Sequence, residues 1–255
     1  MIGLIAGDII GSVYEWKQAG TKDFPLFNPQ SRWTDDTVLS LAIAEAIMTG
    51  RPYAECLRAF GRKYPQAGYG GLFKRWINAD NADPYNSWGN GSGMRVAAIG
   101  YAFNTEEEVL NEAEKSALPT HNHPEGIKGA QAIALSVYLA RTSATKDQIR
   151  GKISELFNYD LSRTVEEIQP TYHFEVSCQG SVPEAIISFL DSESYEDSIR
   201  NAIYLGGDSD TIGAMAGAIA EAWYGNVPNE IQSQVKKILP TDLFDVLTRF
   251  SLKYV

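Results

Sequence analysis

Apolar residues recur at helical spacing through most of this sequence. Within residues 34–49, an apolar stripe with intervals of three and four is formed by Val38, Leu41, Ala42 and Ala46. Further apolar residues widen this stripe, so the helix is expected to lie at the centre of the molecule. The same spacing predicts other helices over residues 53–64, 92–103, 106–117, 124–140, 146–157, 182–190, 195–205, 211–224 and 230–237. Because strand-like alternation is nearly absent, the sequence predicts an all-α fold.

The predicted helices have ordinary start and stop signals. Thr105 and Thr145 stand at N-cap positions, Pro124 stands in a first turn, and Gly50 and Gly225 follow last turns. The stretches 19–33, 66–91 and 162–181 show no clear periodicity. Structureless connections longer than about 15 residues are uncommon in compact domains. We therefore expect these stretches to be functional loops that surround a site.

Length and charge limit the classes of protein that fit. A chain of 255 residues with 44% apolar residues can bury one large core, so residues 1–255 are expected to form a single compact domain. The net charge of −10 argues against binding to nucleic acid or to an anionic membrane.

Two further observations bear on the compartment. No apolar run approaches the roughly 20 residues of a membrane span. Cys56 and Cys178 are the only cysteines, which is too few for a disulfide framework. A reducing, cytoplasmic location is expected.

Two short acidic clusters lie far apart in the sequence, at residues 34–37 and 206–211. Each combines two carboxylates with hydroxyl oxygens, and each precedes a predicted helix. Carboxylate and hydroxyl oxygens are the ligands that Mg²⁺, Mn²⁺ and Ca²⁺ prefer. If the clusters meet in space, they form a metal site. The alternative is that Thr34 is only an N-cap and that Asp35 and Asp36 complement the helix dipole.

The segment from Ser87 to Arg95 reads as a glycine-rich loop that runs into a helix. Glycines allow ligand oxygens to approach backbone N–H groups, and a helix N-terminus favours phosphate. A plain tight turn is the alternative. His121 and His123 follow further along the chain, and hydrogen bonding to a substrate or to the backbone is favoured over zinc binding, because no third nitrogen or sulfur ligand stands at suitable spacing.

Taken in order, five segments of the sequence resemble the ADP-ribosylglycohydrolase family. They are residues 3–8 with Gly11 and Glu15, then 33–37, 89–95, 120–121 and 206–211. The resemblance implies an all-α domain of orthogonally packed helices with a binuclear Mg²⁺ centre, in which Mn²⁺ could replace Mg²⁺. It implies as metal ligands Thr34, Asp35, Asp36, Asp208, Asp210 and Thr211. It implies as substrate-binding residues Gly89, Asn90, Gly91, Ser92 and His121.

The function implied by this resemblance is metal-dependent hydrolysis of the bond between ADP-ribose and an acceptor. The acceptor would be an ADP-ribosylated protein or a small ADP-ribosylated molecule, through arginine, serine or another atom. The reaction needs a carboxylate base, for which the candidates are Glu15, Asp36 and Asp83. Two alternatives stay open: a non-catalytic protein that binds ADP-ribose or a nucleotide, and a metal-dependent hydrolase of another ribosyl or phosphoryl compound. The residues do not predict an oligomeric state.

Overall fold

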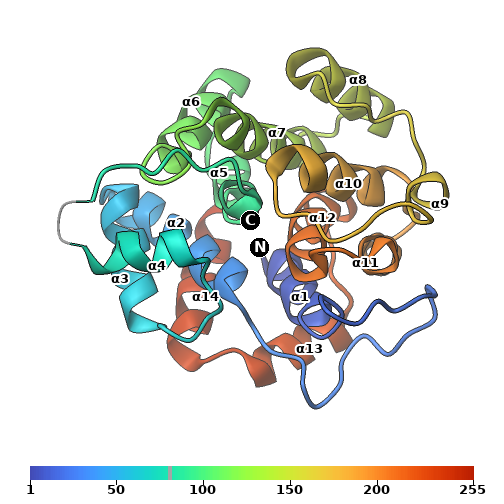
Figure 1. Cartoon of the computed structure of the whole chain (residues 1–255), viewed down its shortest axis with the longest axis horizontal. Coiled ribbons are helices and arrows are strands. Elements are labelled where there is room, and N and C mark those ends of the chain that lie inside the picture. Colours follow the sequence, from blue (N-terminus) through green and yellow to red (C-terminus); the bar gives the residue numbers. More distant parts are fainter. Residues whose placement is uncertain (80–81) are drawn as a thin grey trace.

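A computed structural model describes residues 1–79 and 82–255, and the regular elements of these residues are helices (Figure 1). The predicted all-α class is confirmed. The α-helices are α1 (Ile2–Gly11), α2 (Asp35–Thr49), α3 (Tyr53–Lys63), α4 (Gly71–Asn78), α5 (Ala97–Ala102), α6 (Glu106–Ala117), α7 (Pro124–Arg141), α8 (Lys146–Phe157), α9 (Val165–Ile168), α10 (Cys178–Leu190), α11 (Tyr195–Leu205), α12 (Ser209–Tyr224), α13 (Asn229–Ile238) and α14 (Thr241–Tyr254). A short 3-10 helix, η1 (Asn90–Ser92), precedes α5.

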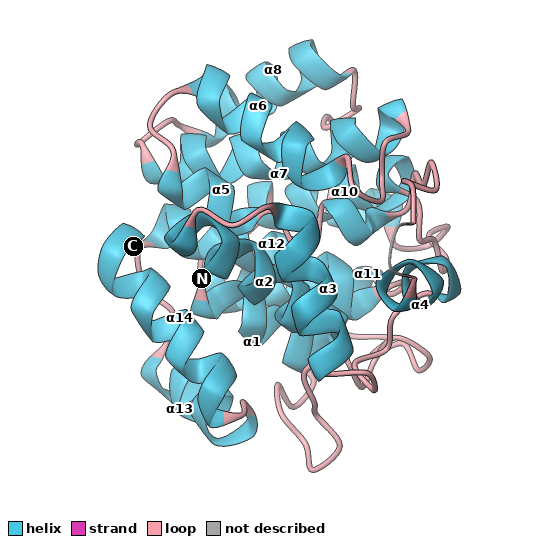
Figure 2. Ribbon diagram, turned by 90° about the vertical axis from the view of Figure 1, so that its left-hand side faces the viewer, coloured by secondary structure: helices cyan, strands magenta, loops and turns pink. Residues whose placement is uncertain are grey.

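Helices α1 and α12 form the most extensive helix pair of the fold, and both figures place them side by side near the centre (Figures 1 and 2). Glycines allow their backbones to approach closely. A Cβ atom added to Gly7 would lie 2.0 Å from the carbonyl oxygen of Gly213, and one added to Gly3 would lie 2.7 Å from that of Gly217. Asp8 follows Gly7, and Asp210 stands one turn before Gly213. The close approach of the two helices at these glycines therefore brings the carboxylates of Asp8 and Asp210 into one region.

Helix α2 crosses the middle of the molecule, as the width of its apolar stripe predicts. Most of its residues are buried, and α1, α3, α5 and α14 pack around it. Its N-cap is Thr34, whose side chain accepts a hydrogen bond of 3.2 Å from the Asp36 N–H. Gly50 ends the helix in the left-handed conformation, at φ 71°. The predicted helix over residues 34–49 is thus confirmed within one residue.

Local sequence signals also placed several outer helices correctly. The predictions for 106–117, 146–157 and 195–205 agree with α6, α8 and α11. Thr105 and Thr145 each form a capping box, in which the threonine hydroxyl and a Glu or Gln side chain satisfy each other's backbone N–H groups. Gly225 ends α12 in the left-handed conformation.

The sequence-based predictions missed helices α1, α4, α9 and α14. The glycines of α1 lower its intrinsic helix propensity, so this helix depends on its packing against α12. Helices α4 and α9 are short and lie inside stretches 66–91 and 162–181, which are therefore only partly irregular. Residues 80 and 81 of the first stretch lie outside the described residues. Helix α14 does carry a signal, because Leu243, Val246, Leu247 and Phe250 follow helical spacing and are buried.

A second difference concerns residues 92–103, for which one continuous helix was predicted. The chain instead forms η1, then a turn, and α5 begins only at Ala97. The glycine-rich loop is therefore longer than the sequence suggested.

The long loops gather on one side of the molecule, near α4 and α11 (Figure 2). None of the helices in the described part of the chain is long and apolar enough to cross a membrane.

Replacement of Gly7 by alanine tests the contact between α1 and α12. The new Cβ would meet backbone atoms of Gly213, which cannot rotate away, so Gly7→Ala should lower the free energy of unfolding by about 1–3 kcal/mol or more. The measurement is denaturant unfolding followed by circular dichroism.

Gly151→Ala is the matched control, because Gly151 lies inside α8 with open space around it. There the substitution should stabilise the protein slightly, since alanine has the higher helix propensity. Equal stability of the Gly7→Ala and native proteins would contradict the close contact.

Candidate functional site

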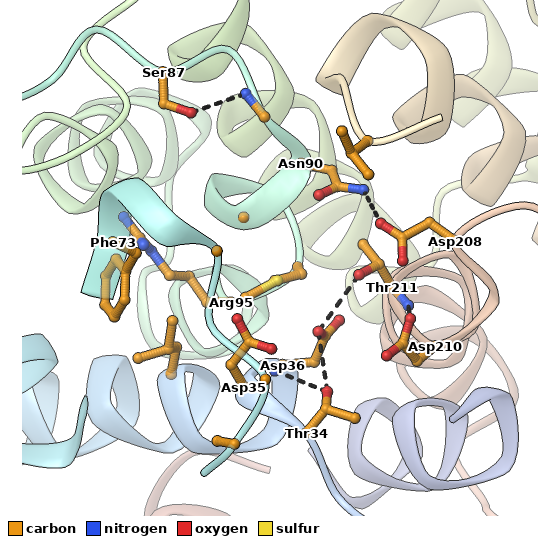
Figure 3. Close-up of a pocket in the computed structure, with 18 of the residues that line it drawn as sticks. Thr34, Asp35, Asp36, Phe73, Ser87, Asn90, Arg95, Asp208, Asp210 and Thr211 are labelled. Atoms are coloured by element: carbon orange, nitrogen blue, oxygen red, sulfur yellow. Dashed lines mark hydrogen bonds between the residues drawn. The ribbon is translucent and has the colours of Figure 1, made fainter. Parts of the chain in front are cut away.

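The two acidic clusters meet in space, each at the start of a helix (Figure 3). Asp35 and Asp36 begin α2, and Asp208 and Asp210 stand at the start of α12. The Thr211 hydroxyl lies within 3.4 Å of Asp36 Oδ2, so side chains 175 positions apart are in contact. The two clusters therefore lie together in space, as a shared site would require.

Asp8 of α1 joins the same group of carboxylates, and it is fully buried. Its Oδ2 accepts hydrogen bonds from the N–H groups of Thr34 (3.0 Å) and Thr37 (3.2 Å) and from the Thr37 hydroxyl. Its Oδ1 accepts from the Thr34 hydroxyl at 2.7 Å. Asp8 thus binds the N-terminus of α2, where backbone N–H groups and the helix dipole favour a negative charge.

One carboxylate oxygen in this group has no partner. Asp36 Oδ1 is buried and forms no hydrogen bond with the described residues. Carboxylate oxygens of Asp8, Asp36 and Asp210 all lie within 4.8 Å of one another, close enough to share one cation. An unpartnered buried carboxylate oxygen beside two other carboxylates is the donor set expected for a hard divalent cation.

The raised pKa values of the carboxylates also indicate that a bound cation would be favourable at this site. Burial, the largest cause, raises the pKa of Asp8 to about 6 and that of Asp35 to about 7. Burial and then the neighbouring carboxylates raise the pKa values of Asp36 and Asp210 well above the ordinary value. Without a positive charge, these groups cannot all ionise together at neutral pH. A bound divalent cation would reverse this effect.

The turn before α12 depends on two glycines in the left-handed region. Gly206 has a φ of 79° and Gly207 a φ of 70°, and a Cβ on either would meet the side chain of Gln18 or Tyr172. This turn presents Asp208 to the site. Asp208 Oδ2 accepts a hydrogen bond of 2.7 Å from Asn90 Nδ2, which links the second acidic cluster to the glycine-rich loop.

A cleft of about 470 Å³ opens beside the carboxylates. Its acidic end is lined by Glu15, Thr34, Asp35, Asp36, Asp208, Asp210 and Thr211. The glycine-rich loop borders it with Ser87, Gly89, Asn90 and Gly91, together with His121. A further wall is formed by residues 66–68 and 70–73, together with Tyr85 and Arg95. The cleft is therefore lined by both groups of residues that the sequence identified, the acidic clusters and the glycine-rich loop with His121.

The glycine-rich loop is fixed by the segment that precedes α10. The Asn90 N–H donates to the Val176 carbonyl at 2.8 Å, and the Cys178 N–H donates to the Trp88 carbonyl at 2.9 Å. A Cβ on Gly91 would lie 3.1 Å from His121 Nε2, so the histidine ring lies directly behind this glycine.

Two predicted site residues lie outside the cleft lining. Ser92 is fully buried, and its hydroxyl donates to the Gly126 carbonyl at 2.7 Å, so its side chain supports the loop from behind. Asp83 is exposed at the surface and does not line the cleft. Of the three candidate bases, Glu15 and Asp36 are the two that line it.

Glu15 lines the acidic part of the cleft and is half-buried. Burial and then the charge of Asp208 raise its pKa above the ordinary value. A carboxylate with a raised pKa in a cleft has the property that proton transfer near neutral pH requires.

Asp8 and Arg95 belong to this region, but the sequence alone predicted no role for either. Asp8 lies in one of the segments that resemble the family, but a single aspartate in an apolar helix gives little sign of being a ligand. Arg95 lies at the end of the glycine-rich segment, and its burial could not be read from its residue type, since arginine is mostly exposed.

Three comparisons agree with one another. The family model described as ADP-ribosylglycohydrolase matches residues 1–253. Human ADP-ribosylhydrolase ARH3 is 28% identical, over 95% of this chain and 90% of that protein. ADP-ribosylarginine hydrolase Tri1 of Pseudomonas putida is 24% identical, over 88% of this chain and 69% of that protein. A solved structure titled ADP-ribosylglycohydrolase-related protein complex matches with a TM-score of 0.74 and 25% identity, over 98% of this chain and 95% of that one.

The pH dependence of stability tests the need for a cation. Asp8 and Asp35 have folded pKa values above the ordinary 3.8, so folding favours their neutral forms. In EDTA, the stability that they contribute should be full below about pH 4 and be lost as the pH rises through about 6–7. Saturating Mg²⁺ should remove this loss. Urea unfolding across this pH range, with EDTA or with Mg²⁺, measures both effects.

Asp36→Asn and Asp83→Asn form a matched pair for the same measurement. In EDTA at pH 7, Asp36→Asn should be more stable than the native protein, because asparagine neither takes up a proton nor buries a charge when the protein folds. It should gain less stability from Mg²⁺, whereas Asp83→Asn should gain as much as the native protein. An equal response of all three proteins to Mg²⁺ would contradict a cation site at Asp36.

Proposed function

The chain belongs to the ADP-ribosylglycohydrolase family, and we propose that it hydrolyses the glycosidic bond between ADP-ribose and an acceptor, with release of ADP-ribose. The observation that carries this proposal is the form of the cleft. Buried carboxylates at the starts of α2 and α12 line one part of it, and a glycine-rich loop with a histidine behind it lines another.

The donor set fits magnesium. Thr34, Asp35, Asp36, Asp208, Asp210 and Thr211 would hold two Mg²⁺ ions, with Mn²⁺ as a substitute. Oxygen is the only donor atom that these side chains offer, which favours Mg²⁺ over zinc. Bound Mg²⁺ would neutralise the carboxylates and polarise oxygen atoms of the substrate. Asp8 would act as support, because its oxygens already hold the N-terminus of α2.

The glycine-rich loop would receive the diphosphate and ribose. Gly89 and Gly91 leave room for ligand oxygens, and Asn90 fixes the loop to Asp208 through its side chain. His121 would hydrogen-bond the same part of the ligand. Ser92 would contribute indirectly, through its hydrogen bond to Gly126. An anionic ligand would be compatible with this acidic cleft only if bound cations changed the sign of the local field.

The bond that breaks joins the anomeric carbon of the ribose to the acceptor atom. A water molecule forms the new bond to that carbon, and its proton passes to a carboxylate while the acceptor leaves with a proton. Glu15 is the favoured base, because it lines the cleft, is half-exposed and has a raised pKa. Asp36 would orient the reacting groups from the floor of the cleft.

The acceptor defines the physiological substrate. An ADP-ribosylated protein, linked through arginine or serine, and a small ADP-ribosylated molecule are both candidates. ADP-ribosylarginine hydrolase Tri1 carries the arginine linkage in its name.

Incubation with mono-ADP-ribosylated arginine and serine peptides, with Mg²⁺ or EDTA, tests the reaction. Free ADP-ribose should appear with Mg²⁺ and not with EDTA. Glu15→Gln should lower kcat by about 10²–10⁴-fold, the usual contribution of a general base. Asp83→Asn should leave kcat unchanged, because Asp83 lies outside the cleft.

The products separate this proposal from the alternatives. Release of AMP or phosphate instead of ADP-ribose would indicate phosphoryl chemistry. Binding of ADP-ribose without turnover of any ADP-ribosylated substrate would indicate a binding protein. Either result would contradict the proposed glycohydrolase activity.

A further inference from the structure

Arg95 is the largest fully buried side chain of the described residues, and it lies in the wall of the cleft. Its Nη2 donates to the Ser116 carbonyl at 3.1 Å and to the Thr120 hydroxyl at 2.8 Å. Its Nε and Nη1 are buried without a partner among the described residues. No nitrogen of this guanidinium is therefore paired with a carboxylate. Burial of an unpaired charge is costly, so stability does not explain the residue.

Thr120 connects Arg95 to His121. The Thr120 hydroxyl oxygen lies 2.7 Å from His121 Nδ1 and accepts from Arg95 at the same time. A guanidinium can only donate, whereas a hydroxyl has one proton to give. A hydroxyl that accepts from a charged donor is polarised, which makes its own O–H a better donor and its oxygen a poorer second acceptor. The favoured arrangement has the Thr120 proton directed at Nδ1.

The other ring nitrogen of His121 faces the glycine-rich loop. Nε2 is the side-chain atom that a Cβ on Gly91 would approach to 3.1 Å, and His121 lines the cleft. Burial, and then the nearby charge of Arg95, lower the pKa of His121 well below the ordinary value. The ring is therefore neutral at pH 7 and carries one proton, on either Nδ1 or Nε2.

We propose that Arg95 is a positioning residue that acts through Thr120 to hold His121 as the neutral Nε2–H tautomer. In this tautomer the ring donates a hydrogen bond toward Gly91 and the cleft. The opposite tautomer would present a lone pair to the cleft and repel an anionic oxygen. The functional consequence rests on the proposed function, in which that oxygen belongs to the diphosphate or ribose of ADP-ribose.

Arg95 would act through Thr120 because its side chain is fully buried, although it belongs to the cleft wall. Its unpartnered nitrogens have almost no accessible surface for a ligand to contact. Tyr85 lies beside the same group, with its ring centroid 6.0 Å from that of His121 and its hydroxyl near Thr120. The buried charge of Arg95 would thus set the direction of the hydrogen bond between Thr120 and His121, whose ring lines the cleft.

Nuclear magnetic resonance can read the tautomer directly in the full-length protein with Mg²⁺ and without substrate. The sequence contains three histidines, so ¹H–¹⁵N spectra of the imidazole rings can be assigned with His123→Gln and His173→Gln variants. The expected result at pH 7 is a neutral His121 ring protonated on Nε2. A ring protonated on Nδ1, or on both nitrogens, would overturn the proposal whatever the protein's activity.

Thr120→Val and Thr120→Ser then test the connection. Valine has nearly the shape of threonine but no hydroxyl, so Thr120→Val should lose the preference for the Nε2–H tautomer. It should also bind ADP-ribose about tenfold more weakly, as expected for loss of one hydrogen bond to a charged group. Thr120→Ser keeps the hydroxyl, so it should keep both the preference for the Nε2–H tautomer and the native affinity for ADP-ribose. A native tautomer and native affinity in Thr120→Val would overturn the proposal.

The tautomer spectra and the ADP-ribose affinity test the two proposals separately. If the native protein does not bind ADP-ribose at all, the proposed function fails, and the tautomer spectra still decide whether Thr120 holds His121 as the Nε2–H form. If Thr120→Val does not fold, the tautomer of the native protein remains decisive, since a ring protonated on Nδ1 would overturn the proposal.

Discussion

The close contact between α1 and α12 is the constraint on which the site depends. Glycines at Gly3, Gly7, Gly213 and Gly217 remove the side chains that would hold the two backbones apart. Because the helices touch along their backbones, Asp8 is brought toward the acidic start of α12. The start of α2 is then fixed by hydrogen bonds from its N-terminus to Asp8. Three segments from opposite ends of the chain are thereby joined at one point.

This arrangement concentrates negative charge where solvent cannot screen it. Asp36 and Asp210 are buried close together, and the described residues provide no basic side chain that pairs with either. Among the described residues, the buried guanidinium of Arg95 lies near the cleft, but it donates to the Thr120 hydroxyl and the Ser116 carbonyl instead. The buried negative charges and the buried guanidinium thus occupy different parts of the cleft. The carboxylates would hold cations at one end of the cleft, while Arg95 would influence a neutral histidine beside the glycine-rich loop.

Much of the fold could be predicted from local sequence signals. Helix α2 and the capped helices α6 and α8 follow from periodicity and capping residues. Helix α1 could not be predicted in this way, since its glycines act through a partner 200 residues away. The cluster pair was found because acidic and hydroxyl residues were adjacent in the sequence.

Side-chain direction was harder to predict than residue type. Ser92 belongs to the glycine-rich segment but turns away to bind Gly126, and Asp83 lies outside the cleft. The role of Arg95 depends on burial and on Thr120, neither of which a motif reveals.

The most direct test of the central claim is a crystal structure of the protein grown with Mn²⁺ at neutral pH, examined by anomalous scattering. If the packing of α1, α2 and α12 builds a cation site, anomalous peaks should lie beside the carboxylates of Asp36 and Asp210, where Asp36 Oδ1 now lacks a partner. A map without Mn²⁺ at these carboxylates, at a concentration that saturates other Mn²⁺ proteins, would contradict the account.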